Sequence, residues 1–277
     1  MPHRTDRRPR RGPLRLLRAL VLDYAFVVRV HLVPRSGRVV PARWKVGDRA
    51  PVLLLPGVYE TWRFLRPIAE RLSDAGHPVV VVPGLAHNRR PILETAERAQ
   101  RVLDAHDLRG VVVLAHSKGG LVGKTMMVRT DDDERIDRMV SVNTPFSGSR
   151  WALLLPTPEL RVFSPRDADL VRLSENLDAN ARVTSLFSGF DLHVTEGSVL
   201  PGATNVELPV DGHFRPLGHR VSQDVAVAAV EDGPEAAAAV PGARLVSAPE
   251  HAASDATVTD DPGEERLRHH LGDGTPA

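Results

Sequence analysis

No cysteine occurs among the 277 residues of this chain, which excludes disulfide bonds, thiolate metal sites and a cysteine nucleophile. Neither sign of charge dominates: 36 basic residues nearly balance 35 acidic ones, so no overall field attracts nucleic acid. Aromatic residues make up only 4%, whereas hydrophobic residues reach 42%, an ordinary value for a soluble globular protein. We therefore expect a cytoplasmic protein with a substantial core that binds no nucleic acid.

Residues 1–36 also lack the unbroken apolar run of a secretion signal or a membrane-spanning helix. Five arginines precede an apolar segment at 14–33, but that segment is interrupted by Arg15, Arg18, Asp23 and Arg29. A signal needs about 7–15 uninterrupted apolar residues and a spanning helix about 20. We predict a basic arm followed by a helix that packs on the domain. The alternative is a basic amphipathic helix in peripheral contact with an anionic membrane surface.

Residues 37–231 alternate short apolar runs with amphipathic stretches. Continuous apolar or β-branched runs are typical of strands that are buried on both faces of a parallel sheet. Such runs occupy residues 51–55, 78–82, 110–115, 138–143 and 182–188. The remaining region, 232–277, is rich in Ala, Pro, Gly, Asp and His, and we predict that it is mostly disordered.

Helical patterns separate the predicted strands. Residues 61–75 place apolar side chains on one face and end at Gly76, and residues 91–106 begin with proline at the first helical position. Further helices are expected at 121–128 and 216–230. Strict alternation of strand and helix implies right-handed crossovers. We therefore predict an α/β fold: a mostly parallel sheet with helices on both faces.

Ser117 lies between the strand at 110–115 and the helix that follows it. Ala115 and Gly119 are the small residues that a nucleophile elbow needs two positions before and two after its serine. In such a turn the hydroxyl is exposed above the sheet, and the helix N-terminus favours developing negative charge. We predict that Ser117 is a nucleophile; the alternative is a serine that only caps the helix. The adjacent His116 should point elsewhere and is not expected to be the base.

Two backbone N–H groups are expected to stabilise the oxyanion of a tetrahedral intermediate. One belongs to Lys118, the residue after the nucleophile. The other should come from the loop after the strand at 51–55, where Gly57 allows close approach of the backbone. We predict Val58 for this role. The alternative is that Pro56 and Gly57 only form a turn.

An acid and a base follow the later strands. Asp191 comes directly after the strand at 182–188, at the carboxyl end where open α/β sheets place active residues. His213 comes after a further strand-like stretch at 205–209. The chain order Ser, Asp, His is the one expected for this fold. We predict that His213 transfers the proton and that Asp191 orients its imidazole.

Other residues compete for these two roles. Glu196 lies in the same loop as Asp191 and is an alternative acid, whereas Asp211 is too close in sequence to His213 to orient it. His193 lies within the loop of the acid. His219 falls inside the helix that is predicted at 216–230.

Five motifs carry a resemblance to a known family: VLLLPG, AHSKGG, NTPFSGS at 143–149, SGFDLHV at 188–194 and VDGHF at 210–214. Over about residues 51–230 the chain resembles the α/β-hydrolase superfamily, and within it bacterial lipase- and esterase-like members. The resemblance implies that Ser117, Asp191 and His213 occupy the nucleophile, acid and base positions. It also implies that the protein needs no metal or organic cofactor, and that a short cap is inserted at about 151–180.

The chain departs from the usual family pattern at three positions. Alanine stands at Ala115 where many relatives have glycine, and proline at Pro56 where many have histidine. Lys118 replaces the frequent methionine or glutamine, which predicts a cation near the site. These departures bear on the substrate more than on the reaction.

The residues and the resemblance together predict hydrolysis of a carboxylic ester, small or lipid-like, through an acyl-enzyme. One alternative is transfer of the acyl group to an alcohol instead of water. Another is a hydrolase-like protein that binds a ligand without turnover. Dehalogenase and epoxide-hydrolase reactions are disfavoured, because relatives with those activities have an aspartate where this chain has Ser117.

Overall fold

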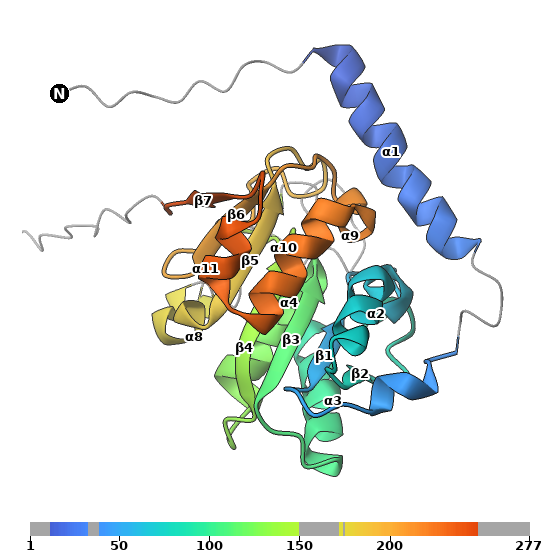
Figure 1. The fold of residues 1–277 in the computed structure, drawn as a ribbon. Helices are drawn as coiled ribbons and strands as arrows, with labels where there is room; N and C mark the ends of the chain where they lie inside the picture. The colour runs from blue at the N-terminus through green and yellow to red at the C-terminus, as the bar shows by residue number, and fades with distance from the viewer. Residues whose placement is uncertain (1–11, 33–38, 150–171, 174, 249–277) are drawn as a thin grey trace, which may run out of the picture.

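The computed structural model describes residues 12–32, 39–149, 172–173 and 175–248. Its centre is a seven-stranded sheet with the strand order β2-β1-β3-β4-β5-β6-β7 (Figure 1). The strands are β1 (Val52–Leu55), β2 (Val79–Val81), β3 (Val111–His116), β4 (Ile136–Val142), β5 (Val183–Ser188), β6 (Thr204–Leu208) and β7 (Arg244–Val246). Strands β1 to β6 are parallel, and β7 pairs antiparallel at the edge. The predicted α/β class with a mostly parallel sheet is confirmed.

Both faces of the sheet are buried, which explains why its strands read as continuous apolar runs. Along β1, Val52 and Leu54 belong to one core cluster, and Leu53 and Leu55 belong to the other. The first face is covered by α2 (Arg66–Asp74), α10 (Arg220–Glu231) and α11 (Pro234–Ala239). The second is covered by α3 (Ile92–Ala105) and α4 (Lys118–Thr125). Successive side chains of a strand point to opposite faces, so β1, β3, β4 and β5 each contribute to both clusters.

Two predicted helices differ in detail from those observed. The helix predicted at 61–75 consists of a short 3₁₀ turn, η3 (Trp62–Phe64), followed by α2. The helix predicted at 216–230 is broken at His219, whose extended backbone separates α9 (Arg215–Gly218) from α10. Further short elements are η2 (Ala42–Lys45), η4 (Ala86–Asn88), the π-helical turn η5 (Met126–Thr130) that continues α4, and α8 (Leu177–Ala181).

Part of the tail that was predicted to be mostly disordered forms regular structure. Helix α11 buries Ala237, and β7 adds to the sheet beside β6. Pairing with the exposed edge of β6 orders a segment that has little apolar periodicity of its own. Residues from 249 onward lie outside the described residues. So does most of the cap that was predicted at about 151–180.

Helix α1 (Pro13–His31) lies at the margin of the body, outside the two layers that cover the sheet (Figure 1). One face, with Ala19, Phe26 and Val30, is buried. On the same face, Asp23 accepts hydrogen bonds from the backbone N–H groups of Phe214 and Arg215, at 2.6 and 2.7 Å. Within the described part of the chain, no helix is long and apolar enough to cross a membrane.

The strand order reverses between β1 and β3, because the chain runs from β1 to β2 on one side and then returns to β3 on the other. In open α/β sheets ligands bind at this point, outside the carboxyl ends of the strands. The loop that follows β1 and the turn that follows β3 meet there. The loops after β4, β5 and β6 lie along the same edge of the sheet.

Candidate active site

Ser117 occupies a sharp turn between β3 and α4. Its backbone has φ 50° and ψ −123°, a conformation that a residue with a side chain adopts only at a cost in energy. The turn leaves no room for a side chain at Gly119, where a Cβ atom would lie 1.8 Å from the carbonyl oxygen of Leu55. Ala115 is fully buried. The small residues on either side of Ser117 are therefore a steric requirement of this turn.

The loop after β1 lies directly against Ser117. A Cβ atom at Gly57 would lie 3.1 Å from the Cβ of Ser117 and 2.5 Å from the carboxylate of Glu60, so only glycine fits. Three backbone N–H groups of this loop already have acceptors. The N–H of Gly57 donates to Glu60 Oε2, that of Tyr59 to the carbonyl of His87, and that of Glu60 to the carbonyl of Gly57. The N–H of Val58, by contrast, donates to no acceptor among the described residues. In this loop, the backbone N–H of Val58 is therefore available to a ligand.

The ammonium group of Lys118, which the sequence predicted near the site, is held by backbone carbonyl oxygens. Its side chain is buried and donates to the carbonyl oxygens of Asn88 and Arg90. Asn88 in turn donates through Nδ2 to the carbonyl of Pro56 at 2.6 Å. Lys118 therefore fastens the segment after η4 to the start of α4, and this segment holds the loop after β1.

His213 and Asp191 form a buried pair. His213 Nδ1 lies 2.7 Å from Asp191 Oδ2, and each side chain is 5% exposed. Burial lowers the pKa of His213, but the charge and hydrogen bond of Asp191 outweigh it, so this pKa lies above its ordinary value. Burial raises the pKa of Asp191, but His213 and the backbone N–H of His193 outweigh it, so this pKa is lowered. An imidazole held in this way has its Nδ1 proton fixed and its Nε2 available as a base.

Asp191 is oriented by its own loop. Its Oδ1 accepts hydrogen bonds from the backbone N–H groups of His193 and Val194, at 2.7 and 3.1 Å, which leaves Oδ2 for His213. The alternative acid, Glu196, accepts from the Thr195 hydroxyl.

The two alternative histidines are placed differently from His213. His193 Nδ1 lies 3.8 Å from Asp191 Oδ1, and its Nε2 lies 3.1 Å from the hydroxyl of Tyr24. Burial, followed by the charge of His213, lowers the pKa of His193. His219 lies between α9 and α10, on the side that faces α1. Of the three, His213 makes the shorter, buried contact with Asp191.

The loop that carries His213 is fastened to the sheet by side chains that the sequence did not single out. The carbonyl oxygen of His213 accepts from His116 Nε2 at 3.0 Å and from Asn143 Nδ2 at 2.9 Å. Asn143, at the end of β4, also bonds the backbone of Gly212 and of Ser188. Because His116 immediately precedes Ser117, these bonds fix the position of His213 relative to the turn after β3.

His116 and Glu60 form a second buried pair beside the first. His116 Nδ1 lies 2.8 Å from Glu60 Oε1, and the ring centroids of His116 and His213 are 4.7 Å apart. A carbonyl oxygen only accepts, so Nε2 of His116 carries a proton, and the contact of Nδ1 with Glu60 needs another. The pair is thus an imidazolium with a carboxylate, or an imidazole with a carboxylic acid. The charge of Glu60 adds to the larger effect of Asp191 in raising the pKa of His213.

Two groups of described residues bring metal-ligand atoms within 4.8 Å of one another: Glu60, His116 and His213, and Asp191, His193 and His213. In the first group both nitrogens of His116 already form hydrogen bonds. In the second, both oxygens of Asp191 do. Atoms of both groups are already engaged in hydrogen bonds, with each other or with the backbone, which disfavours a metal at either place.

Residues 50–195, more than half of the chain, match the family model for the alpha/beta hydrolase fold. The chain belongs to the α/β-hydrolase family. No curated protein matches it in sequence.

The chain is similar to solved structures of other hydrolases. Aspergillus fumigatus lipase B has a TM-score of 0.57 at 19% identity, covering 72% of this chain and 58% of that one. An extracellular alpha/beta-hydrolase from a Paenibacillus species has a TM-score of 0.48 at 17% identity, covering 67% and 99%. A Bacillus licheniformis lipase in its propeptide form has 0.48 at 14%, covering 62% and 50%. This α/β hydrolase spans about half the length of that Bacillus licheniformis lipase.

No functional role was predicted for Glu60 from the sequence. His116 was considered only as the base, and it was not expected to have that role. The available signal was a glutamate three residues after Gly57 and a histidine that ends an otherwise apolar strand. Polar residues that are buried at such positions need partners, which are most often other buried polar groups. That argument would have suggested a pair, but not which residues form it.

Proposed function

We propose that this α/β hydrolase cleaves carboxylic esters through a covalent acyl-enzyme, with Ser117 as nucleophile, His213 as base and Asp191 as the orienting acid. The observation that carries the proposal is the buried contact between His213 Nδ1 and Asp191 Oδ2, at 2.7 Å, in a loop bonded to the residue before Ser117. The strained backbone of Ser117, between a strand and a helix, supports the proposal, because a nucleophile elbow holds its serine in such a turn. The same geometry supports the order of roles inferred from the sequence.

The reaction has two halves. Ser117 Oγ attacks the acyl carbon while its proton passes to Nε2 of His213, and the resulting imidazolium is stabilised by Asp191. The backbone N–H of Val58, with that of Lys118, donates to the oxyanion. Collapse of the tetrahedral intermediate breaks the bond to the alkoxy group, which takes the proton from His213 and leaves as an alcohol. Water then attacks the acyl-enzyme by the same route and releases the acid.

We further propose that the acyl group of the substrate is apolar, as in lipid-like esters. The similarity to Aspergillus fumigatus lipase B, with its TM-score of 0.57, supports this proposal. At 19% identity that similarity extends only to the fold. Turnover of esters of increasing acyl length measures the chain-length preference.

The test is covalent labelling of the wild-type protein with a fluorophosphonate, followed by peptide mass spectrometry, alongside turnover of p-nitrophenyl esters of increasing acyl length. We expect one adduct, on the peptide containing Ser117, and hydrolysis of at least part of the ester series. An adduct without turnover of any ester would contradict hydrolysis and favour the binding-protein alternative. An adduct on another serine would contradict the assignment of the nucleophile.

We expect Glu60 to act as a positioning residue for this reaction, because it orders both the loop after β1 and, through His116, the loop of His213. Glu60→Ala removes the acceptor from two buried donors, and we expect kcat to fall about 10²-fold with KM little changed. Glu60→Gln keeps an oxygen for the Gly57 N–H and an amide for His116 Nδ1, so it should recover most of the activity. Steady-state kinetics on a p-nitrophenyl ester measures both parameters.

The matched control for this prediction is Glu97→Ala, which removes an exposed glutamate from α3. It should leave kcat within about threefold of wild type, as expected for surface changes. Because the charge of Glu60 helps to raise the pKa of His213, the acid limb of the pH–rate profile should move to lower pH in Glu60→Gln. Equal losses in the alanine and glutamine variants would show that the charge of Glu60, rather than its hydrogen bonds, supports activity.

A further inference from the structure

Helix α1 carries a second apolar face opposite the one that it buries. The buried residues Ala19, Phe26 and Val30 lie about half a turn of the helix from a row of exposed apolar residues. This row, which we call the apolar stripe, consists of Leu14 (81% exposed), Leu17 (57%), Val21 (58%), Val28 (56%) and Leu32 (76%). Isolated exposed apolar residues are ordinary, but a continuous stripe along a 19-residue helix marks an interaction surface.

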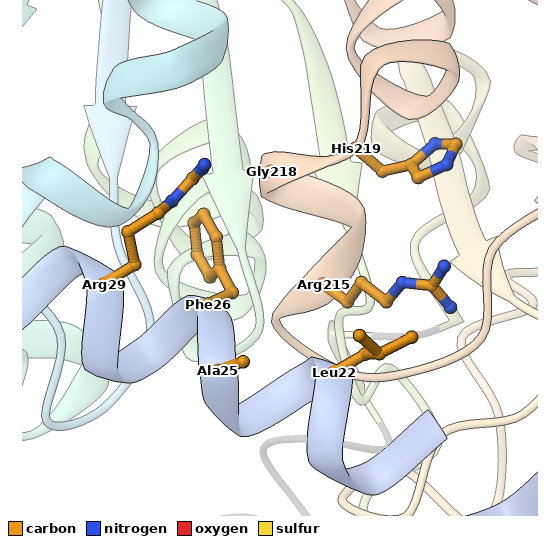
Figure 2. A pocket seen from close by; sticks show the side chains of 7 residues that line it. All are labelled: Leu22, Ala25, Phe26, Arg29, Arg215, Gly218 and His219. Carbon is orange, nitrogen blue, oxygen red and sulfur yellow. The ribbon is translucent and has the colours of Figure 1, made fainter. Parts of the chain in front are cut away.

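A basic, hollowed flank borders the apolar stripe. A pocket of about 230 Å³ lies between α1 and α9, with Leu22, Ala25 and Phe26 as its apolar lining. In Figure 2 the side chains of Arg29, from α1, and Arg215, from α9, stand on either side of this lining. Within the described ranges, neither guanidinium forms a hydrogen bond or ion pair; Arg29 lies over the Phe26 ring at 5.5 Å. Among the residues that the structure describes, no acidic side chain lines the pocket.

The charge of the chain is concentrated at this end. Residues 1–32 contain eight arginines and two aspartates, a net charge of +6 in a chain whose total is +1. Arginine binds phosphate groups through its planar set of donors, and apolar side chains beside it enter the boundary between headgroups and acyl chains. A second copy of this helix would bring like charges together, whereas an anionic bilayer offers both the opposite charge and an apolar layer.

We propose that the apolar stripe and the Arg29–Arg215 flank dock this protein on an anionic phospholipid surface. Each guanidinium then contacts lipid phosphate, and the stripe enters the headgroup layer. Docking also sets the position of the active site, because α1 contacts its loops directly. Asp23 bonds the backbone of Phe214 and Arg215, and Tyr24 bonds His193. The loops that carry His213 and Asp191 are thereby held close to the bilayer. The docking itself does not depend on the proposed ester hydrolysis.

The experiment measures co-sedimentation of the full chain with vesicles of phosphatidylcholine alone and with about one third phosphatidylglycerol. We expect binding to the anionic vesicles only, weakening as salt is raised. Arg29→Gln combined with Arg215→Gln should weaken binding about 30-fold, since each arginine near such a surface contributes about 1 kcal/mol. Leu17→Glu combined with Val21→Glu should weaken it at least tenfold, because the stripe then carries two negative charges.

Two matched pairs of control substitutions make the same changes of charge elsewhere. Arg101→Gln with Arg109→Gln removes two exposed arginines, and Val46→Glu with Leu245→Glu replaces apolar residues that are 72% and 59% exposed. Both controls should bind anionic vesicles within about threefold of wild type. Circular dichroism and thermal melting report whether every variant is folded.

Three results would overturn the proposal. The first is equal binding to both kinds of vesicle, or none. The second is unchanged binding by the stripe variant or the arginine variant. The third is a dimer in solution that the stripe variant converts to a monomer, which would assign the stripe to a second copy of the chain. Saturable binding of inorganic phosphate that the arginine variant loses, without vesicle binding, would identify a soluble phosphate site and likewise exclude docking on lipid.

Discussion

Ser117→Ala should lower kcat for ester hydrolysis about 10⁶-fold and abolish labelling by a fluorophosphonate. Removal of a serine nucleophile leaves only the background that the oxyanion donors and substrate binding provide. The substitution should not disturb the fold. Alanine keeps the Cβ atom and adopts the same φ of 50°, and the backbone N–H of residue 117 continues to bond the carbonyl of Val142 at 2.9 Å. Steady-state assays with p-nitrophenyl esters measure the loss of kcat directly.

The control for this prediction is Ser222→Ala, which removes a buried hydroxyl from α10 that has no hydrogen-bond partner in the described part of the chain. It should retain wild-type turnover and labelling. Turnover by Ser117→Ala within tenfold of wild type would exclude Ser117 as the nucleophile. A large loss in both alanine variants would point to damage to the fold instead, and a thermal melt separates these two cases.

The central strands of the sheet were predictable from sequence because they are buried on both faces. Runs such as Val111–Leu114 contain no polar residue, so nothing in them suggests a helix or a strand with one exposed face. The predicted and observed limits of these strands differ by at most two residues. The edge strand β7 was not predictable. Its segment has no apolar run of its own and is ordered by pairing with β6, a contact between residues about forty positions apart.

The candidate site was predictable as far as chain order and strand ends determine it. Ser117, Asp191 and His213 each follow a strand of the predicted sheet, and neighbouring strand ends meet at one edge. The supporting contacts were not predictable, because they join segments that share no local pattern. Asp23 bonds the backbone of Phe214 across 191 residues, and His116 bonds the carbonyl of His213 across 97.

Lys118 shows how little a local pattern says about the surroundings of a long side chain. A lysine directly after Ser117 predicted a cation near the site. The ammonium group instead bonds carbonyl oxygens of the segment after η4, which ends some 30 residues earlier in the chain. Sequence fixes the position of the Lys118 backbone in the turn, but the direction of a long flexible side chain depends on which acceptors the fold brings within its reach.

Asp191→Asn should lower kcat about 10⁴-fold while leaving the fold intact. The reason lies in how the loop holds this side chain. Oδ1 accepts two backbone hydrogen bonds, so the oxygen of an asparagine would take that place, and its amide nitrogen would face His213 Nδ1. An amide donates to Nδ1 and thus selects the tautomer that has its proton on Nε2. The imidazole then cannot accept the proton of Ser117.

The control for Asp191→Asn is Glu196→Gln, which neutralises the alternative acid of the same loop and should keep kcat within about threefold of wild type. The reverse pattern, with activity lost in Glu196→Gln and kept in Asp191→Asn, would assign the acid to Glu196.

The pH–rate profile tests the same pair independently of the size of the loss. His213 acts as a base only when neutral, and Asp191 raises its pKa. Activity of the wild type should therefore fall as pH decreases through a midpoint above the ordinary histidine value of about 6.5. In Asp191→Asn the largest influence that raises this pKa is absent, and burial, which lowers it, is opposed only by the charges of Glu60 and Asp23, so the residual activity should persist to lower pH. An acid limb at the same pH in both proteins would mean that Asp191 does not set the protonation of the base, and the assignment of these two residues as acid and base would then be wrong.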